Sequence, residues 1–186
     1  ARSTTGEIHC FPVVENVHEA GILASSLVPA RISEDLNRKA LNITTQIAQG
    51  LKLHGMLAIE MFVMPDGQLL VNELAPRPHN SGHYTQDGTN VCQFEQHLRA
   101  ICGWPLREPK LHSPTVMLNL LGEHISALQT WHLGLPAEAH LHWYGKAEAR
   151  PGRKMAHLNL CAASLDEALE ELEKRKLRSP PKGIYT

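Results

Sequence analysis

Apolar positions recur at helical spacing in three segments of the chain. The first follows Ser33 and includes Leu36, Ala40, Ile43, Ile47 and Leu51. Ser33 suits an N-cap because acidic residues follow it in the first turn, and Gly50 is a stop signal. The second segment spans residues 91–101, and we expect its apolar face to point toward the core; that face consists of Val91, Phe94, Leu98 and Ile101. The third begins at Ser164, which forms a capping-box pattern with Glu167.

Apolar runs bounded by turn signals predict strands. Residues 8–14, 115–121, 139–144 and 155–160 have this pattern. Two further runs, 56–64 and 68–74, flank the sequence Pro-Asp-Gly at 65–67, which is typical of a hairpin turn. Both runs are apolar on both faces, so we expect their sheet to be covered on both sides. Residues 75–89 lack periodicity and are rich in Pro, His, Asn, Ser and Gly, which predicts a long functional loop.

Composition places the chain among ordinary globular proteins. Hydrophobic residues make up 42% and charged residues 20% of its 186 residues, and no run reaches the ~18 consecutive apolar residues of a membrane span. The 18 basic and 19 acidic residues give a net charge of -1 without a basic stripe, which argues against a nucleic-acid partner. Four widely spaced cysteines without a C-x-x-C pair indicate free thiols in a reducing cytoplasm. The chain begins without methionine and, on pattern, within an element, so we expect a fragment of a larger protein.

Glu60 and Glu73 are the most informative polar residues, because each lies in an otherwise apolar predicted strand. If Asp66 and Gly67 form a two-residue turn, the glutamates face each other across the hairpin, where like charges repel. A magnesium ion between them would make the arrangement favourable. A type I turn with a bulged glycine would instead place Asn72 opposite Glu60. Two strand-end glutamates paired with arginines are the equally weighted alternative.

Several motifs resemble those of the ATP-grasp superfamily. They are AIEMFV at 58–63, LVNELAPRPHNSGH at 70–83, QFEQHLRAI at 93–101, HLHWYGK at 140–146 and RPGRK at 150–154. Within that superfamily they are similar to the ATPase subunit of phosphoribosylaminoimidazole carboxylase, also called 5-(carboxyamino)imidazole ribonucleotide synthetase, over essentially the whole chain. The Asn-Glu-x-x-Pro-Arg motif is shared by several ATP-grasp ligases, whereas HNSGH and RPGRK together are much more specific.

The resemblance implies an α+β fold. The C-terminal half of an ATP-grasp domain, with an antiparallel sheet and packing helices, would occupy residues 1–106. A linker over 107–114 and a small β-rich C-terminal domain with a terminal helix over 115–186 would follow. The implied activity is an ATP- and Mg²⁺-dependent ligase reaction of purine biosynthesis, in which 5-aminoimidazole ribonucleotide is carboxylated with bicarbonate through carboxyphosphate. Since full members of the family carry an N-terminal domain and a nucleotide-covering lid before this segment, we expect the fragment to be inactive alone, to need the missing N-terminal half, and to form a homodimer when complete.

The same resemblance implies roles for individual residues. Glu60 and Glu73 would hold Mg²⁺ on the ATP phosphates, and Asn72 and Glu73 would belong to the ATP-binding site. Arg77 and His79 are the implied catalytic residues: the guanidinium of Arg77 suits an oxyanion, and His79 suits bicarbonate binding or acid–base chemistry. The implied substrate-binding residues are His79, Asn80, Ser81, Lys146 and Arg153. In this set Lys146 and Arg153 would grip the 5'-phosphate of the ribonucleotide.

Two other hypotheses remain open. The histidine pairs at 79 and 83 and at 140 and 142 suggest structural zinc, but i,i+4 spacing brings ligands together only on a helix, and Pro76 and Pro78 disfavour a helix there. The fragment could instead be a non-catalytic module that packs against other domains or a second subunit. Such a module would expose an unusually apolar face.

Overall fold

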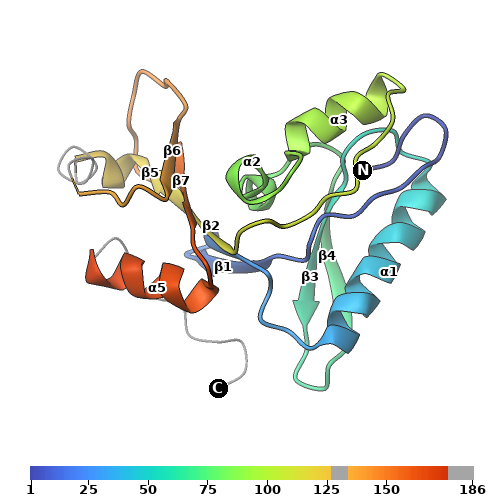
Figure 1. Ribbon diagram of the computed structural model, residues 1–186, viewed down its shortest axis with the longest axis horizontal. Helices are drawn as coiled ribbons and strands as arrows, with labels where there is room; N and C mark the ends of the chain where they lie inside the picture. Colours follow the sequence, from blue (N-terminus) through green and yellow to red (C-terminus); the bar gives the residue numbers. More distant parts are fainter. Residues whose placement is uncertain (127–133, 176–186) are drawn as a thin grey trace. The chain divides into compact units, whose positions relative to one another are not determined.

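The computed structural model describes residues 1–126 and 134–175 (Figure 1). The chain divides into two compact units, each described by itself. The first comprises Ala1–Val13 and Ile32–Leu111, and the second comprises Val14–Arg31 and His112–Thr186. A segment from early in the chain therefore belongs to the C-terminal unit. The boundaries 1–106, 107–114 and 115–186 concern family domains rather than these units and stay a prediction.

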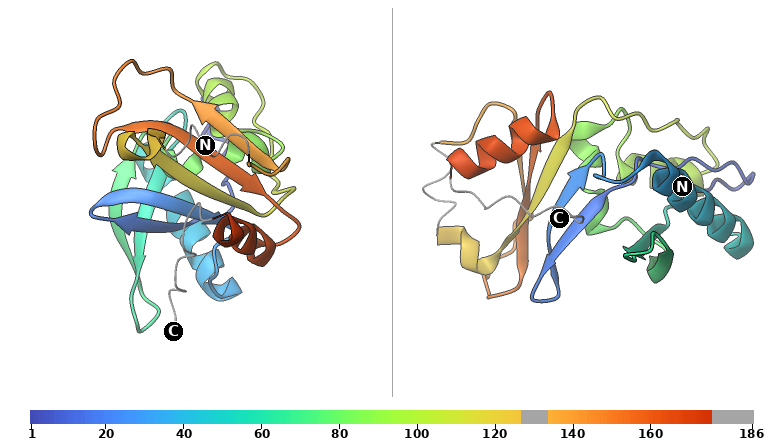
Figure 2. Two further views of the ribbon diagram at one scale, coloured as in Figure 1. Left: turned by 90° about the vertical axis from the view of Figure 1, so that its left-hand side faces the viewer. Right: turned by 90° about the horizontal axis from the view of Figure 1, so that it is seen from below.

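Helix α1 (Glu34–Leu51) lies beside the hairpin of β3 (Ala58–Val63) and β4 (Leu69–Ala75) in the first unit (Figures 1 and 2). Ser33 caps α1, since its hydroxyl accepts a hydrogen bond from the Leu36 amide at 3.2 Å. The helix continues past Gly50, and Lys52 provides a left-handed C-cap with a φ of 51°. Three further helical segments follow the hairpin: η1 (Asn80–Gly82), α2 (Thr85–Gly88) and α3 (Gln93–Ile101).

The buried face of α3 is polar, contrary to the expectation from its apolar pattern. Gln93 and Gln96 are 2% and 0% exposed, whereas Phe94, Leu98 and Ile101 are 40%, 53% and 45% exposed. Both glutamines form hydrogen bonds with backbone groups, which satisfies their amides inside the protein. The prediction that the apolar face points toward the core was therefore wrong for Phe94, Leu98 and Ile101. Periodicity identifies a face of a helix but not what covers it.

The β3–β4 hairpin exposes large apolar side chains. Phe62, Leu70, Val71 and Leu74 are 57%, 46%, 45% and 41% exposed. The hairpin forms a two-stranded sheet of its own. The expectation that this sheet is covered on both sides is thus wrong for the part of the chain that the structure describes.

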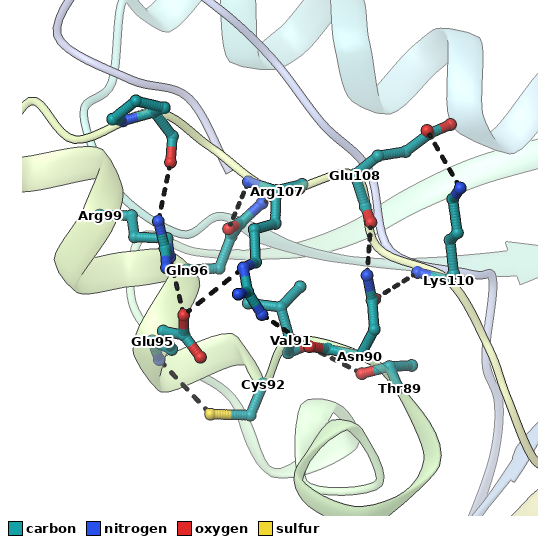
Figure 3. Close-up of polar contacts among 11 residues, drawn as sticks. Thr89, Asn90, Val91, Cys92, Glu95, Gln96, Arg99, Arg107, Glu108 and Lys110 are labelled. Carbon is teal, nitrogen blue, oxygen red and sulfur yellow. Dashed lines mark hydrogen bonds and ion pairs between the residues drawn. The ribbon is translucent and has the colours of Figure 1, made fainter.

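The start of the predicted linker is anchored to the first unit by side chains of residues 90 and 96 (Figure 3). The side-chain amide of Gln96 bonds both backbone groups of Arg107, with Nε2 to the carbonyl oxygen at 2.5 Å and Oε1 to the amide nitrogen at 3.2 Å. Asn90 Oδ1 accepts from the Lys110 amide at 2.7 Å, and its Nδ2 donates to the Glu108 carbonyl at 3.1 Å. Paired hydrogen bonds of this kind satisfy the backbone of an irregular segment, so residues 107–110 hold a defined position on this unit.

The second unit contains a five-stranded antiparallel sheet with strand order β1-β2-β5-β7-β6. Its strands are β1 (Glu15–Glu19), β2 (Ile22–Val28), β5 (Thr115–Leu121), β6 (Ala139–Trp143) and β7 (Lys154–Cys161). A short helix, η2 (Gly122–His124), follows β5. The last three strands agree with the predicted ones, but the β1–β2 hairpin was not predicted. Residues 8–14 form no strand and contain only one partner of an isolated bridge, between Arg2 and Ile8.

Helix α5 (Leu165–Lys174) covers one face of this sheet (Figure 2). Its buried residues Ala168, Leu169 and Leu172 join a core cluster whose strand residues are Leu27, Val116, Leu118, Leu120, Ala156, Leu158 and Leu160. The hydroxyl of Ser164 caps the helix by accepting from the Glu167 amide at 3.1 Å. The predicted helix start is thus confirmed.

Candidate active site

The turn between β3 and β4 determines which residues face each other. The Met64 carbonyl accepts from the Gly67 amide at 2.8 Å, the Met64 amide donates to the Gln68 carbonyl at 2.9 Å, and Gly67 has a φ of 80°. These features define a type I turn followed by a bulged glycine. The turn pairs Val63 with Leu69. Continued without interruption, this register would place Asn72 opposite Glu60.

A second irregularity restores the pairing of the two glutamates. The register shifts between Glu60 and Met61: Met61 pairs with Val71, whereas Glu60 pairs with Glu73, so Asn72 is the extra residue of a β-bulge. Bulges leave one residue unpaired and re-aim its side chain. Glu60 therefore lies opposite Glu73, as the two-residue-turn register predicted, although the turn itself has the alternative geometry.

The opposed carboxylates fit a divalent cation. Two negative charges directly across a ladder repel each other, and oxygen ligands from carboxylates are what Mg²⁺ prefers. The Glu60 side chain is 16% exposed, and its Oε1 lies 3.9 Å from His79 Nδ1. Glu73 is exposed on β4. The pair would supply two protein ligands and leave the other coordination positions for water and phosphate.

The loop after β4 folds back through η1. His79 is its N-cap residue: His79 Nδ1 lies 2.8 Å from Ser81 Oγ and accepts weakly from the Ser81 amide at 3.4 Å. Ser81 is buried, and Asn80 opens the short helix with its carbonyl bonded to the His83 amide at 3.0 Å. Arg77 is exposed, and its Nη1 donates to the Pro78 carbonyl at 3.0 Å. The turn is therefore ordered by local bonds, with the His79 ring beside Glu60.

One residue with a large structural role at this site was missed by sequence reasoning. Gln93, at the start of α3, is 2% exposed and bonds both backbone groups of His79 at 2.8 Å. The only signal in the sequence was the presence of a glutamine in the predicted helix, on the face that is buried in the structure. Such a residue demands a polar partner inside the protein.

Lys146 and Arg153 lie in the other unit, in the loop between β6 and β7. Lys146 Nζ donates to the Lys154 carbonyl at 2.5 Å and lies 5.3 Å from the centroid of the Tyr144 ring. Burial raises the pKa of Tyr144 to about 12, and its hydroxyl lies 2.8 Å from His157 Nδ1. Arg153 Nη1 donates to the Glu148 carbonyl at 3.1 Å. The two basic side chains thus share one loop.

The remaining candidate residues all belong to the first unit. The structure brings Glu60, Asn72 and Glu73 together on the hairpin and Arg77, His79, Asn80 and Ser81 on the loop that follows it. Within residues 1–126 and 134–175, no group of three or more His, Cys, Asp or Glu side chains is placed to hold a metal ion. None of the helices in that part of the chain is long and apolar enough to cross a membrane.

Comparison with known families defines the class of protein. Residues 1–94 match the ATP-grasp domain, so the chain belongs to the ATP-grasp family. Residues 115–171 match the phosphoribosylaminoimidazole carboxylase C-terminal domain. The predicted fold, an ATP-grasp portion followed by a small C-terminal domain, is therefore confirmed.

Known proteins of similar sequence and structure are N5-carboxyaminoimidazole ribonucleotide synthases. The chain is 48% identical over 171 residues to the one from Bacillus subtilis (strain 168), covering 92% of this chain and 45% of that protein. For Escherichia coli (strain K12) the identity is 44%, with 93% and 47% covered. An ADP complex of an N5-carboxyaminoimidazole ribonucleotide synthetase superposes with a TM-score of 0.92 at 49% identity, covering 95% of this chain and 46% of that one.

A fungal structure adds a ligand complex. The Aspergillus clavatus N5-carboxyaminoimidazole synthase, solved with ADP and 5-aminoimidazole ribonucleotide, has a TM-score of 0.88 at 34% identity, with 94% of this chain and 48% of that one covered. The chain therefore spans about half the length of the relatives that it matches.

Proposed function

We propose that this chain is part of an ATP-dependent ligase that carboxylates 5-aminoimidazole ribonucleotide with bicarbonate in purine biosynthesis. The observation that carries the proposal is the opposed pair of Glu60 and Glu73, with His79 Nδ1 3.9 Å from Glu60. The relative of this chain from Aspergillus clavatus, whose structure was solved with ADP and 5-aminoimidazole ribonucleotide, supports the choice of substrate. ATP and Mg²⁺ are the proposed cofactors.

In this proposal the hairpin serves the nucleotide. Glu60 and Glu73 hold Mg²⁺, which when bound neutralises charge on the phosphates. Asn72, set out of the ladder by the bulge, lies next to them in the ATP site. The proposed roles thus follow from the pairing register, which gathers all three polar residues at one point of an otherwise apolar hairpin.

The loop and the second unit serve the other substrates. The exposed guanidinium of Arg77 suits an oxyanion such as bicarbonate, and His79 adds an imidazole for binding or acid–base chemistry. Asn80 and Ser81 complete the substrate site on the loop. Lys146 and Arg153 bind the 5'-phosphate, since both are cationic and belong to one loop of the second unit.

The proposal can be tested by substitutions in a complete protein that contains this sequence and is as long as the relatives. Glu73→Gln is expected to abolish turnover, whereas Lys146→Ala is expected mainly to raise the KM for the ribonucleotide. Glu108→Gln, which changes charge by the same amount at an exposed site, is the control and is expected to leave activity unchanged. Wild-type turnover by the Glu73 variant would contradict the proposal.

The isolated 186-residue chain tests the need for further sequence. We propose that an N-terminal half with the rest of the ATP site is required and that the complete ligase is a homodimer. ATP-dependent carboxylation by the isolated chain would contradict the first statement, and a monomeric mass for the complete protein would contradict the second. We also propose a cytoplasmic location, because the four cysteines are widely spaced in the sequence and form no C-x-x-C pair.

The exposed apolar residues of the hairpin and of α3 favour a second candidate function, a non-catalytic packing or subunit-interaction module. It predicts that substitutions at Glu60 and Glu73 leave the function of the complete protein unchanged. We further propose family domains at 1–106 and 115–186 with a linker between them. Family matches over 1–94 and 115–171 support that division.

A further inference from the structure

Two buried glutamines on α3 each form two hydrogen bonds with the backbone of one residue outside the helix. Gln93 Oε1 accepts from the His79 amide and Gln93 Nε2 donates to the His79 carbonyl, both at 2.8 Å. Gln96, three residues further along the same helix, bonds the amide and the carbonyl of Arg107 in the same way (Figure 3). The two side chains therefore make the same kind of contact, but only Gln93 contacts the loop of the candidate site.

The contacts of Gln93 determine the hydrogen-bonding state of His83. The backbone amide of His79 can only donate, so the atom that accepts from it is Oε1 and the other is the NH₂ group. One N–H of that group serves the His79 carbonyl, and Nε2 also lies 3.2 Å from His83 Nδ1. An amide NH₂ only donates, so His83 Nδ1 must accept, and the hydrogen of the neutral ring is on Nε2.

Neighbouring residues leave the Gln93 amide little freedom. A Cβ atom on Gly82 would lie 2.3 Å from Gln93 Oε1, so only glycine admits the amide at this place. Thr85 Oγ1 accepts from the Gln93 backbone amide at 2.9 Å and donates to the Gly82 carbonyl at 2.6 Å. The His83 ring also stacks on Phe94, with centroids 5.8 Å apart. The turn is therefore held through both its backbone and its imidazole.

We propose that Gln93 is a positioning residue, which fixes the turn at residues 79–83 and holds His83 as the Nε2–H tautomer. Its hydrogen bonds hold the backbone of His79, whose ring lies next to Glu60, and they make His83 Nε2 a hydrogen-bond donor. The tautomer stands on the geometry alone, whereas the consequence for catalysis rests on the proposed ligase function.

Nitrogen NMR of the histidine side chains tests the tautomer in the 186-residue chain. His83 Nδ1 is expected to have the chemical shift of an unprotonated nitrogen and Nε2 that of a protonated one. Gln93→Glu replaces the donor with an acceptor and is expected to move the hydrogen to Nδ1; Gln96→Glu, the matched control, is expected to leave His83 unchanged. Wild-type His83 with its hydrogen on Nδ1, or an equal mixture of the two forms, would overturn the proposal without any variant.

Kinetics in a protein of full family length test the positioning role. Gln93→Met, which keeps the volume and removes the hydrogen bonds, is expected to lower kcat about tenfold or more while the KM for MgATP stays within about twofold. Gly82→Ala, which displaces the same amide, is expected to have the same effect, and Gln96→Met to have neither. Equal losses for Gln93→Met and Gln96→Met would assign Gln93 a purely structural role and overturn the proposal. If the wild type has no carboxylase activity the ligase function fails, while the NMR result still decides the tautomer.

Discussion

The opposed glutamates predict that the stability of the chain responds to Mg²⁺ through these two side chains. Directly opposed residues of an antiparallel pair have Cβ atoms about 5 Å apart, which allows carboxylates about 6 Å apart. Two such charges repel by about 0.7 to 1.4 kcal/mol for effective dielectric constants of about 80 to 40. Physiological salt roughly halves this energy, which leaves about 0.5 kcal/mol of repulsion between the two carboxylates in the metal-free hairpin.

Substitution of either carboxylate by an amide should therefore stabilise the metal-free protein. Glu60→Gln and Glu73→Gln are each expected to raise Tm by about 1–2 °C in the presence of a chelator. Magnesium should reverse the order. At ten times its Kd it stabilises the wild type by about 1.4 kcal/mol, or about 3–5 °C, and neither variant retains the pair that binds it.

Thermal unfolding in a chelator and in MgCl₂, with NaCl matching the ionic strength, measures both effects. Glu108→Gln is the control, because its carboxylate is exposed and lies 4.0 Å from Lys110 Nζ. This variant should show the wild-type response to magnesium. The reasoning is refuted if both glutamine variants are less stable than the wild type in chelator and all four proteins shift equally with magnesium.

Three further predictions concern stability and need only unfolding measurements. Burial raises the pKa of Tyr84 above its usual value, so above about pH 10 the unfolded state loses a proton that the folded state keeps, and the free energy of unfolding falls. Tyr84→Phe removes the hydrogen bond to the Pro12 carbonyl and should cost about 1 kcal/mol of stability near pH 7. In urea titrations, the same variant should lose less stability at alkaline pH than the wild type. Glu15→Gln weakens the contacts of the buried Glu15 carboxylate with Arg31 at 2.9 and 2.5 Å and should lower stability by about 1.5–3 kcal/mol in urea. Ser33→Ala removes the α1 cap and should cost about 1 kcal/mol in the same assay; no loss would contradict the capping role.

The predictability of the elements followed the strength of their local signals. Capped helices beginning after Ser33 and Ser164 and the strands at 115–121 and 155–160 combine periodicity with clear boundaries, and the structure contains them. The β1–β2 hairpin was not predicted because Ser25 and Ser26 interrupt β2. Its sequence therefore shows neither an alternation of apolar and polar residues nor a continuous apolar run. Both serines are buried, and Ser26 Oγ donates to Asn16 Oδ1 at 2.8 Å, a partner that only the folded hairpin supplies.

The candidate site was predictable where it depends on motifs and unpredictable where it depends on long-range polar contacts. Glu60 and Glu73 could be selected from the sequence because charged residues interrupt apolar runs there. His79 could be selected only from the HNSGH motif at 79–83, through the family resemblance. Gln93 could not be assigned a partner, since its contact with His79 joins residues fourteen positions apart across an irregular loop. Helix α3 buries the face that carries Gln93 and Gln96 because backbone groups elsewhere in the chain form hydrogen bonds with their amides. The spacing of apolar residues does not reveal such partners.

The position of Asn72 explains why the carboxylate pair exists at all. In the register set by the turn, Glu60 would face Asn72, and Glu73 would pair with Ile59 and point to the opposite side of the sheet, because successive residues of a strand alternate between faces. One extra residue in β4 corrects this shift and returns Glu73 to the side of Glu60. The bulge therefore does more than interrupt the ladder: a hairpin without it would keep every apolar contact near the turn and lose the only arrangement in which these two carboxylates could share a cation.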